Sequence, residues 1–503
     1  MDAIDSFLNH VTMYRLALIG LSGVAALSVI LSLFGWLPYT GFELLFSLIL
    51  LIIAARAANA VGALFTKASP TPESAYITAL ILFFILAPLQ SAPDTLMLMA
   101  VAAVAMLSKY LIAINQKHLF NPAAFAVFAF SVFGSGIAVW WVANPILLPF
   151  VLVLGLLIVR KLRRFDLFWS FAIMAALVLM IRSLLSGIDI GNAASQLFVS
   201  GPLIFFGTIM VTEPQTTPPT RANRLVYGGL IGLFFSLVFQ YGTLSATPEL
   251  ALLIGNAYSF IVGRQRRIKL RFQSSAPLTR EVYELTFVSE TPVKFRPGQY
   301  MEWTMPHRKS DGRGIRRHFT IASAPSDPFV RVGVRMPVES STYKDALREL
   351  RNGAVVTATG VDGDFVLPED PDRKIACIAG GIGITPFVSM FRELAAQHAR
   401  RDIVLIYAAA TPLDFVYRDE IDSYKDAIGL CIIYLPTDFA EISNWEGSSG
   451  YVTNELIKKA VPDFATRAWY LSGPDALVKD YRWLIHGMGV RNHDIFTDYF
   501  PGF

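Results

Sequence analysis

The first half of the sequence contains long apolar runs that are rare in chains that fold in water. A bilayer core of about 30 Å requires roughly 20 apolar residues per helix, and a scan for such runs finds about ten before residue 265. We therefore expect a polytopic helical membrane domain over residues 1–265. The expected spans are 16–37, 42–65, 74–90, 95–113, 121–141, 144–161, 165–187, 197–213, 224–242 and 247–264.

Charge placement predicts how this domain is oriented. Although 54% of the whole chain is apolar, it has 43 Lys and Arg residues, and only 12 of them lie in Met1–Gly263. Connections after the even-numbered runs contain Lys or Arg, whereas those after the odd-numbered runs contain neither. Because cytoplasmic loops are enriched in basic residues, we expect both termini to be cytoplasmic in a multi-pass protein of a bacterial inner (plasma) membrane. The N-terminus also lacks the basic region and cleavage site of a signal peptide, so the first run should be retained.

Several classes of site are disfavoured by composition. The cysteines Cys377 and Cys431 are distant from each other in apolar runs, which predicts two buried thiols and no disulfide, iron–sulfur cluster or other metal site. Only His10 and His118 lie in the membrane half, whereas two bis-histidine haems would need four histidines. The net charge of +4 is explained by topology, so we expect membrane lipid as a partner and no nucleic acid, and protein partners stay open.

Two polar segments interrupt the apolar background, at Lys117–Ala124 (KHLFNPAA) and at Thr212–Arg224 (TEPQTTPPTRANR), and a glycine-rich stretch follows at Tyr227–Gly232. One interpretation is a pair of interfacial loops. The pattern also resembles the membrane flavosubunits of the Rnf complex and of the sodium-translocating NADH:quinone reductase (the RnfD/NqrB family), over roughly residues 40–264. That family attaches FMN to the Thr of a Ser-Gly-Ala-Thr tetrapeptide, which this sequence lacks.

A covalent membrane flavin is therefore not expected, and a non-covalent FMN remains a hypothesis. Arginines would meet its phosphate, and polar side chains of the two segments would donate hydrogen bonds. The residues assigned to this site are Arg56, Asn121, Thr212, Thr216, Arg221 and Arg224.

The periodicity changes after Arg267. Alternating stretches such as Arg267–Phe272 and Tyr283–Phe287 are typical of half-buried strands, and they predict an antiparallel β-barrel over residues 266–370. From residue 371 to 503, apolar strands such as KIACIAG and VLIYAAA alternate with helical patterns, which predicts an α/β domain with a parallel sheet. The first of these strands runs into Gly380–Pro386 (GGIGITP). At a strand-to-helix junction such a turn can hold a pyrophosphate, although alone it is also compatible with a plain tight turn.

Further motifs resemble the ferredoxin-NADP reductase superfamily in the family's order over residues 266–503. They are Pro297–Tyr300 (PGQY), Arg317–Thr320 (RHFT), Ser340–Leu347 (SSTYKDAL), Gly363–Phe365, the GGIGITP turn, Gly473-Pro474 and an aromatic C-terminus. The resemblance implies an FAD domain at 266–370 and an NAD(P)-binding domain at 371–503, with FAD and NAD(P)H as cofactors.

The resemblance also assigns roles to residues. Arg317, Ser341 and Thr342 would hold the flavin phosphates, Phe319 would stack on the flavin ring, and Thr320 would hydrogen-bond near flavin N5. Thr385 and Ser472 would hold the nicotinamide, which makes them candidate catalytic residues together with Thr320. Phe500 would cover the flavin, or belong to a packed tail. The remaining cofactor-binding candidates are His318, Gly380, Gly381, Gly383, Pro386, Gly473 and Pro474.

Three positions depart from the family pattern. Phe319 replaces a Tyr, and Ser472 replaces a Cys. Ala409 and Ala410 stand where NADP-preferring members tend to have Ser and Arg, so NADH is favoured over NADPH.

The expected activity is hydride transfer from NADH to FAD, followed by electron transfer to an acceptor in or across the membrane, which would be a second flavin or a quinone. Two alternatives stay open. One is a redox-driven ion-translocating subunit, although Glu43, Asp94, Asp189 and Glu249 lie near the outer ends of the expected spans. The other is a diaphorase whose membrane half is only an anchor.

Overall fold

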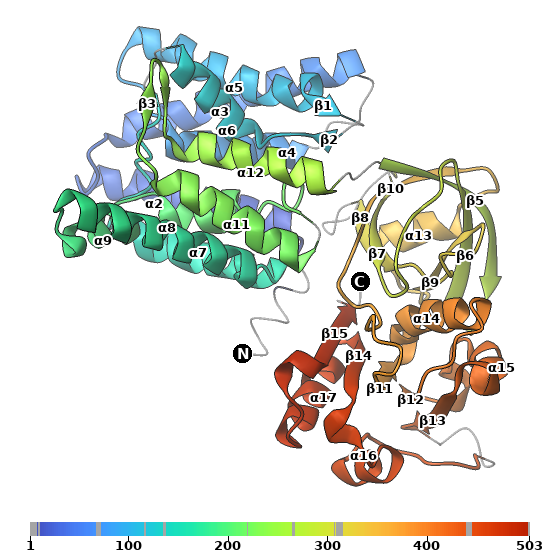
Figure 1. Cartoon of the computed structure of the whole chain (residues 1–503). Helices are drawn as coiled ribbons and strands as arrows, with labels where there is room; N and C mark the ends of the chain where they lie inside the picture. The colour runs from blue at the N-terminus through green and yellow to red at the C-terminus, as the bar shows by residue number, and fades with distance from the viewer. Residues whose placement is uncertain are drawn as a thin grey trace. The chain divides into compact units, whose positions relative to one another are not determined.

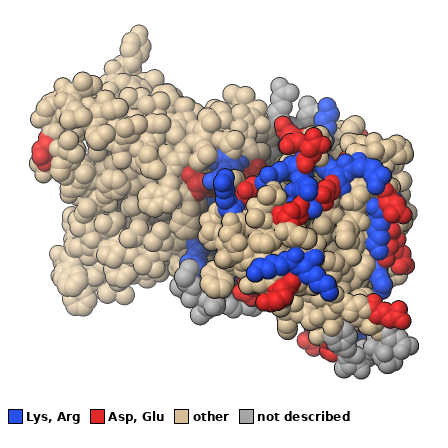
Figure 2. Space-filling model, turned by 60° about the horizontal axis from the view of Figure 1, so that its bottom comes forward, with Lys and Arg blue, Asp and Glu red and all other residues tan. Residues whose placement is uncertain are grey.

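A computed structural model describes residues 8, 11–66, 72–114, 117–133, 137–218, 220–263, 267–305, 307, 315–438 and 445–500. The chain divides into two compact units, Met1–Arg264 and Gln265–Phe503, and both are drawn in Figure 1. On the face shown in Figure 2, charged side chains cover much of the C-terminal unit and are sparse on the N-terminal unit, as the separation of apolar and charged sequence predicts.

The N-terminal unit is helical, and each predicted span contains a helix. The helices are α2 (Met13–Leu33), α3 (Gly41–Thr66), α4 (Pro72–Ile85), α5 (Ala92–Leu111), α6 (Pro122–Val132), α7 (Leu148–Leu162), α8 (Phe165–Ser186), α9 (Ile190–Phe198), α10 (Leu203–Phe205) with the π-helix η1 (Phe206–Met210), α11 (Arg221–Ser236) and α12 (Pro248–Gly263). Short two-residue strands pair between them, β1 (Ala113–Ile114) with β2 (Lys117–His118) and β3 (Gln240–Tyr241) with β4 (Leu244–Ser245).

The expected number of about ten membrane spans is not confirmed. Within the described residues, four helices are long and apolar enough to cross a membrane, in α2, α3, α5 and α8, and a pair bent by 49°, Ile190–Phe198 with Leu203–Met210, raises the number to five if it is one span. Short helices explain the difference. Helix α6 has 11 residues, which at 1.5 Å per residue cover about half of a bilayer core.

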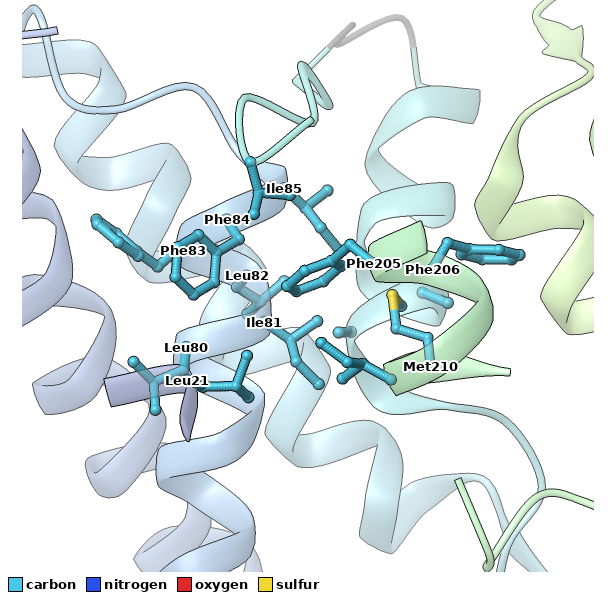
Figure 3. Close-up of a cluster of buried hydrophobic side chains, with 14 of the residues drawn as sticks. Leu21, Leu80, Ile81, Leu82, Phe83, Phe84, Ile85, Phe205, Phe206 and Met210 are labelled. Carbon is cyan, nitrogen blue, oxygen red and sulfur yellow. The ribbon is translucent and has the colours of Figure 1, made fainter. Parts of the chain in front are cut away.

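The core of this unit is built around α4, which is apolar on every side because other helices surround it. Figure 3 shows Leu80, Phe83 and Phe84 of α4 packed among buried side chains of other helices, including Phe205. The rings of Phe84 and Phe205 lie 5.6 Å apart. Helices α8 and α11 also approach closely, because a Cβ on Gly232 would lie 2.4 Å from the Phe171 carbonyl oxygen.

The first part of the C-terminal unit is a six-stranded antiparallel sheet in the order β8-β7-β10-β5-β6-β9. Its strands are β5 (Arg267–Pro277), β6 (Val282–Ser289), β7 (Tyr300–Thr304), β8 (Arg316–Thr320), β9 (Val330–Arg335) and β10 (Val355–Asp362), and helix α13 (Thr342–Arg348) lies between β9 and β10 in sequence. The antiparallel strands agree with the prediction. Closure into a barrel is not confirmed, because β8 and β9 are the sheet edges and no described ladder joins them.

The second part is a five-stranded parallel sheet in the order β13-β12-β11-β14-β15, as the alternating pattern predicted. Its strands are β11 (Ile375–Gly380), β12 (Ile403–Ala409), β13 (Leu430–Pro436), β14 (Ala468–Pro474) and β15 (Ile495–Phe500), and its helices are α14 (Thr385–Ala396), α15 (Arg418–Ile428), α16 (Asn454–Ala460) and α17 (Asp475–Gly487). Alternate residues of β11 face two separate cores: Cys377 belongs to the one that includes α14, and Ile378 to the one that includes α17. Helices therefore cover both faces of the sheet (Figure 1).

Candidate cofactor site

Arg317 lies on β8 at the edge of the antiparallel sheet. Its side chain is buried, its Cζ lies 5.0 Å from the ring centroid of Tyr343, and its Nη1 donates a 2.6 Å hydrogen bond to the Arg316 carbonyl. Side chains alternate between the two faces of a strand, so His318 points away from Arg317. His318 is exposed and lies edge-on to Tyr300, with ring centroids 5.3 Å apart. The structure thus separates these two predicted cofactor-binding residues.

The predicted phosphate-binding hydroxyls lie at the start of α13. Ser341 caps the helix by accepting a hydrogen bond from the Lys344 amide at 3.4 Å. The Thr342 hydroxyl lies 3.0 Å from His307 Nε2, and His307 Nδ1 lies 2.9 Å from the Met305 carbonyl oxygen. Sequence reasoning missed His307, because a lone histidine in a loop after a strand belongs to none of the recognised motifs.

Phe319 has an aromatic surrounding that suits a role in ring stacking. It is half-buried, and its ring centroid lies 6.2 Å from that of Trp303 and 6.1 Å from that of Tyr343. Thr320, one residue later, is buried at the end of β8. Because side chains alternate along the strand, Phe319 shares the face of Arg317. That face therefore presents a buried cation and a partly accessible ring, a pair that can hold an anionic group beside a planar ring.

The glycine-rich turn follows β11 as predicted. Gly381 starts a short 3₁₀ turn, η2 (Gly381–Ile384), with φ of +52°, a backbone conformation that favours glycine. A Cβ on Gly383 would lie 2.4 Å from the Ser472 carbonyl oxygen and 2.6 Å from Gly473 Cα. Only glycine fits there, so the turn and the end of β14 form one continuous backbone surface at the carboxyl edge of the parallel sheet.

Thr385 and Ser472 meet at this edge. Thr385 is buried at the start of α14, and its hydroxyl donates to the Ile382 carbonyl at 3.1 Å. The Ser472 hydroxyl is fully buried and has no hydrogen-bond partner within the described residues. An unsatisfied buried hydroxyl is costly, and a polar ligand such as a carboxamide would satisfy it. The donor set therefore fits the nicotinamide predicted for it.

Gly333 of strand β9 brings the antiparallel sheet close to Thr385. A Cβ on Gly333 would lie 2.8 Å from Thr385 Cγ2, so the two sheets approach closely here. The predicted flavin side and nicotinamide side of the site thus belong to adjoining structures within one unit.

The carboxyl end of β12, next to the glycine-rich turn, bears on nucleotide preference. Ala409, the last residue of β12, is buried, and Ala410 is exposed. In the turn that follows, Asp414 accepts hydrogen bonds from the amide and hydroxyl of Thr411, and the backbone amide of Asp438 donates to the Ala410 carbonyl at 2.8 Å.

The C-terminal segment forms β15, which sequence reasoning did not predict to be a strand. Its last residue, Phe500, pairs in register with Pro474 of β14. Residues 501–503 and the side chain of Phe500 lie outside the description, so its predicted position over the flavin stays a prediction.

The structure brings some of the predicted membrane-flavin residues together. Asn121 Nδ2 donates to Glu213 Oε2 at 2.6 Å, and the Asn121 amide donates to Asn256 Oδ1 at 2.8 Å. Asn256 Nδ2 in turn donates to the hydroxyl of Tyr227 at 3.0 Å, which completes a buried polar network among α6, α11 and α12. Thr212 lies nearby in sequence, but its hydroxyl donates to the Thr208 carbonyl at 2.6 Å.

The predicted arginines have the following contacts and exposures. Arg56 is exposed and lies over the ring of Tyr76, 5.3 Å from its centroid. Arg224 forms a 3.0 Å ion pair with Asp166, and Arg221 is exposed at the start of α11. Thr216 is buried, its hydroxyl lies 3.5 Å from the Glu213 carbonyl oxygen, and its side chain hydrogen-bonds that of Tyr227, so Thr216 belongs to the network.

Two family models match the chain. One, described as the NQR2, RnfD, RnfE family, matches residues 144–268, and the other, described as an oxidoreductase NAD-binding domain, matches residues 377–482. The chain therefore fuses a region of the first family to a reductase-type NAD-binding domain.

Curated relatives match the C-terminal part. Glycine betaine monooxygenase reductase subunits of Chromohalobacter salexigens and Pseudomonas aeruginosa are 26% and 29% identical over 216 and 217 residues. Each match covers 42% of this chain and 58% of the relative, so the chain spans less than two thirds of either relative. A flavohemoprotein of Rhodopirellula baltica is 25% identical over 296 residues, covering 51% of this chain and 70% of the relative.

Solved structures with a similar arrangement include the FAD/NAD-binding domain of a nitric oxide dioxygenase from Vibrio cholerae, with a TM-score of 0.41 and 17% identity over 46% of this chain and 98% of that chain. Another is a flavohemoglobin from Malassezia yamatoensis, with a TM-score of 0.41 and 19% identity over 69% of this chain and 98% of that chain.

Proposed function

Because this chain joins a region of the NQR2, RnfD, RnfE family to an oxidoreductase NAD-binding domain, we propose that it is a membrane-bound flavoprotein reductase. It oxidises NADH through FAD and passes the electrons to an acceptor in or across the membrane, either a second flavin or a quinone. FAD, when bound, accepts electrons in pairs and releases them singly. The observation that supports this most strongly is the approach of Thr385 to Gly333, where the glycine-rich turn adjoins the antiparallel sheet.

The chain's own residues would bind and orient both cofactors. Arg317 neutralises phosphate, with Ser341, Thr342 and His307 as further polar groups at the start of α13. Phe319 presents its ring to the flavin, and Thr320 donates a hydrogen bond at its reactive edge. Thr385 and Ser472 hold the carboxamide of the nicotinamide, which aligns donor and acceptor and excludes water.

NADH is the favoured donor because the end of β12 offers no cation for a 2′-phosphate among its described residues. Ala409 and Ala410 have no side chain that could pair with a phosphate, and Asp414, in the turn that follows, adds negative charge, which opposes a phosphate.

The membrane half would act as an electron conduit. A buried polar network costs free energy to desolvate, and a simple anchor has no need of the Asn121–Glu213 contact. This network supports the conduit over the diaphorase alternative, and a non-covalent FMN near Asn121 is the form of the acceptor that the resemblance suggests. Glu249 is buried and accepts a 3.0 Å hydrogen bond from Trp140 Nε1. A buried carboxyl group of this kind is the observation that favours the ion-translocating alternative. The proposed setting is a bacterial inner membrane with the reductase unit on the cytoplasmic side.

The experiment is anaerobic titration of the detergent-purified full chain with NADH, with FAD and FMN quantified after acid release. We expect one FAD per chain, bleached by NADH, and a second flavin if the conduit holds FMN. Purified protein that binds no FAD, or whose FAD is not bleached by NADH, would refute the proposal. One FAD without a second flavin points to a quinone acceptor.

A further inference from the structure

A polar stripe follows one face of α14, starting from the nicotinamide side of the site. Thr385, Ser389 and Arg392 stand at positions i, i+4 and i+7, which share one helix face, and all three are buried. Each contacts the antiparallel-sheet half of the unit, and α14 lies between the two sheets (Figure 1). We call these three side chains and their partners the α14 seam.

The first contacts of the seam lie close to the proposed reaction. Thr385 packs against Gly333 of β9, as described above. One turn further, the Ser389 hydroxyl donates a 2.7 Å hydrogen bond to the Ser323 carbonyl. Ser323 follows Thr320 by three residues, so this bond ties the segment that presents Thr320 to the helix that presents Thr385.

Arg392 is the third residue of the seam, and all three nitrogens of its guanidinium donate hydrogen bonds. Nη1 donates to the Ala322 carbonyl at 2.9 Å, and Nη2 donates to Glu284 of β6 at 3.0 Å. Nε and Nη2 together form a two-pronged pair with Glu420 of α15, at 2.6 and 2.8 Å. One side chain thus joins the antiparallel sheet, α14 and α15. Such a planar fork is possible for Arg and impossible for Lys.

Tyr417 also contacts the Arg392 guanidinium. Its ring lies under the Arg392 guanidinium, 5.3 Å from Cζ to the ring centroid, and its hydroxyl would be 3.1 Å from a Cβ on Gly333. Tyr417 has φ of +60°, a conformation that is strained for a side chain of this size and persists only where surrounding contacts hold it.

From these contacts we infer that Arg392 is a positioning residue for hydride transfer, because it holds the Thr320 segment and Thr385 at a set separation. This inference rests on the proposed function. Thr320 ends strand β8 and Thr385 begins helix α14, so no single element determines the distance between them. Hydride transfer depends steeply on that distance, since misplacement by about 1 Å can cost on the order of 100-fold in rate.

The chain contains a matched control for Arg392. Arg467 is equally buried and also binds two carboxylates and a carbonyl: Asp463 at 2.6 Å, Asp402 at 2.7 Å and the Ile375 carbonyl at 3.0 Å. All of its partners lie within the parallel-sheet half. Replacing either arginine by Lys removes buried hydrogen bonds to two carboxylates and a carbonyl, but only Arg392→Lys disturbs the seam.

The test is anaerobic stopped-flow reduction of the bound flavin by NADH in the full-length protein. For R392K we expect the limiting rate constant to fall by about tenfold or more, with the Kd for NADH within about twofold of wild type and FAD content unchanged. The slowed step should show a primary isotope effect with 4-deuterated NADH.

S389A, which removes one seam hydrogen bond with little change of volume, should slow the same step by a few fold. R467K should lower the unfolding temperature about as much as R392K does, yet leave the rate constant within about twofold of wild type.

Equal slowing by R392K and R467K would overturn the inference, as would an R392K variant in which only the Kd for NADH changes. If the wild-type flavin is not reduced by NADH, the proposed function fails, and the seam is then judged by amide hydrogen exchange. Faster exchange at Ile321 and Ala322 in R392K than in R467K supports the seam, and equal exchange in the two variants refutes it.

Discussion

The guanidinium of Arg317 lies over the ring of Tyr343, 5.0 Å from Cζ to the ring centroid, beside the start of α13. This contact places a buried cation of a sheet edge against the helix that starts at Thr342. The arrangement suits an anionic group, since Arg binds phosphate through two parallel hydrogen bonds.

Arg317→Ala is expected to reduce FAD retention at least tenfold, because hydrogen bonds to charged groups contribute about 1.5–3 kcal/mol each. FAD retention by Arg317→Lys should lie between those of the wild type and Arg317→Ala, since Lys keeps the positive charge but cannot donate two parallel hydrogen bonds to one phosphate. The measurement is FAD per chain after gel filtration. Arg316→Lys, on the opposite face of β8, serves as the control and should retain FAD. Retention of FAD by Arg317→Ala at the wild-type level would contradict the assignment.

Gly383→Ala should weaken NADH binding by about tenfold or more, because the new methyl would collide with backbone atoms of Ser472 and Gly473. The Kd for NADH, measured by flavin reduction, reports the effect. Gly487→Ala is the matched control: nothing lies within 4 Å of its added Cβ, so it should stabilise α17 slightly, by about 0.4–1 kcal/mol. Unchanged NADH binding in Gly383→Ala would argue against a nucleotide site at this turn.

The wild-type enzyme should have a higher kcat/KM for NADH than for NADPH, because Ala409 and Ala410 at the end of β12 offer no cation for a 2′-phosphate. Ala410→Arg introduces a cation at the exposed end of β12 and should raise kcat/KM for NADPH by about tenfold relative to NADH. Ala410→Ser, which adds no charge, should change this ratio little. A wild-type preference for NADPH would show that the adenosine end binds elsewhere.

Asn121→Ala removes the side-chain bond to Glu213 and the cap bond from the Ala124 amide, and it keeps the backbone bond to Asn256. We expect it to affect two activities differently. NADH oxidation by a soluble one-electron dye should stay within about twofold of wild type, since it needs only the C-terminal unit. Turnover with the acceptor of native membrane vesicles should drop by about tenfold, because the polar network no longer holds its geometry. Ser131→Ala, which removes a bond internal to α6, is the control. Equal retention of both activities in Asn121→Ala would favour the anchored diaphorase.

One of the two cysteines should react with maleimide in the native protein, and both after denaturation. Cys377 is buried in the central strand β11, and this burial raises the pKa of its thiol, which suppresses the reactive thiolate. Cys431 was expected to be buried but is exposed, because β13 is the edge strand of the parallel sheet. Mass spectrometry after labelling should find the adduct on Cys431 alone, and Cys431→Ser should abolish native labelling. Labelling of native Cys377 would contradict this account.

The local patterns of the sequence determined much of this protein. Apolar run length predicted helices in the first half, alternation predicted the antiparallel strands of the second, and the glycine turn after KIACIAG predicted where a nucleotide would bind. These features are local, since they follow from periodicity and from backbone sterics within a few residues.

Tertiary structure decided what those patterns could not. An apolar run crosses a membrane as one helix only if that helix is long enough, and its length depends on where it ends. Helix α6 ends at Val132 and is too short to cross, although its sequence is apolar. Whether Arg56 joins Asn121 depends on how α3 and α6 pack, and the structure sets Arg56 against Tyr76 instead. The contacts of His307 with Thr342 and of Arg392 with Ala322 link residues that are 35 and 70 positions apart in the chain. No spacing rule predicts such pairs, because their distance is set by the packing of separate elements.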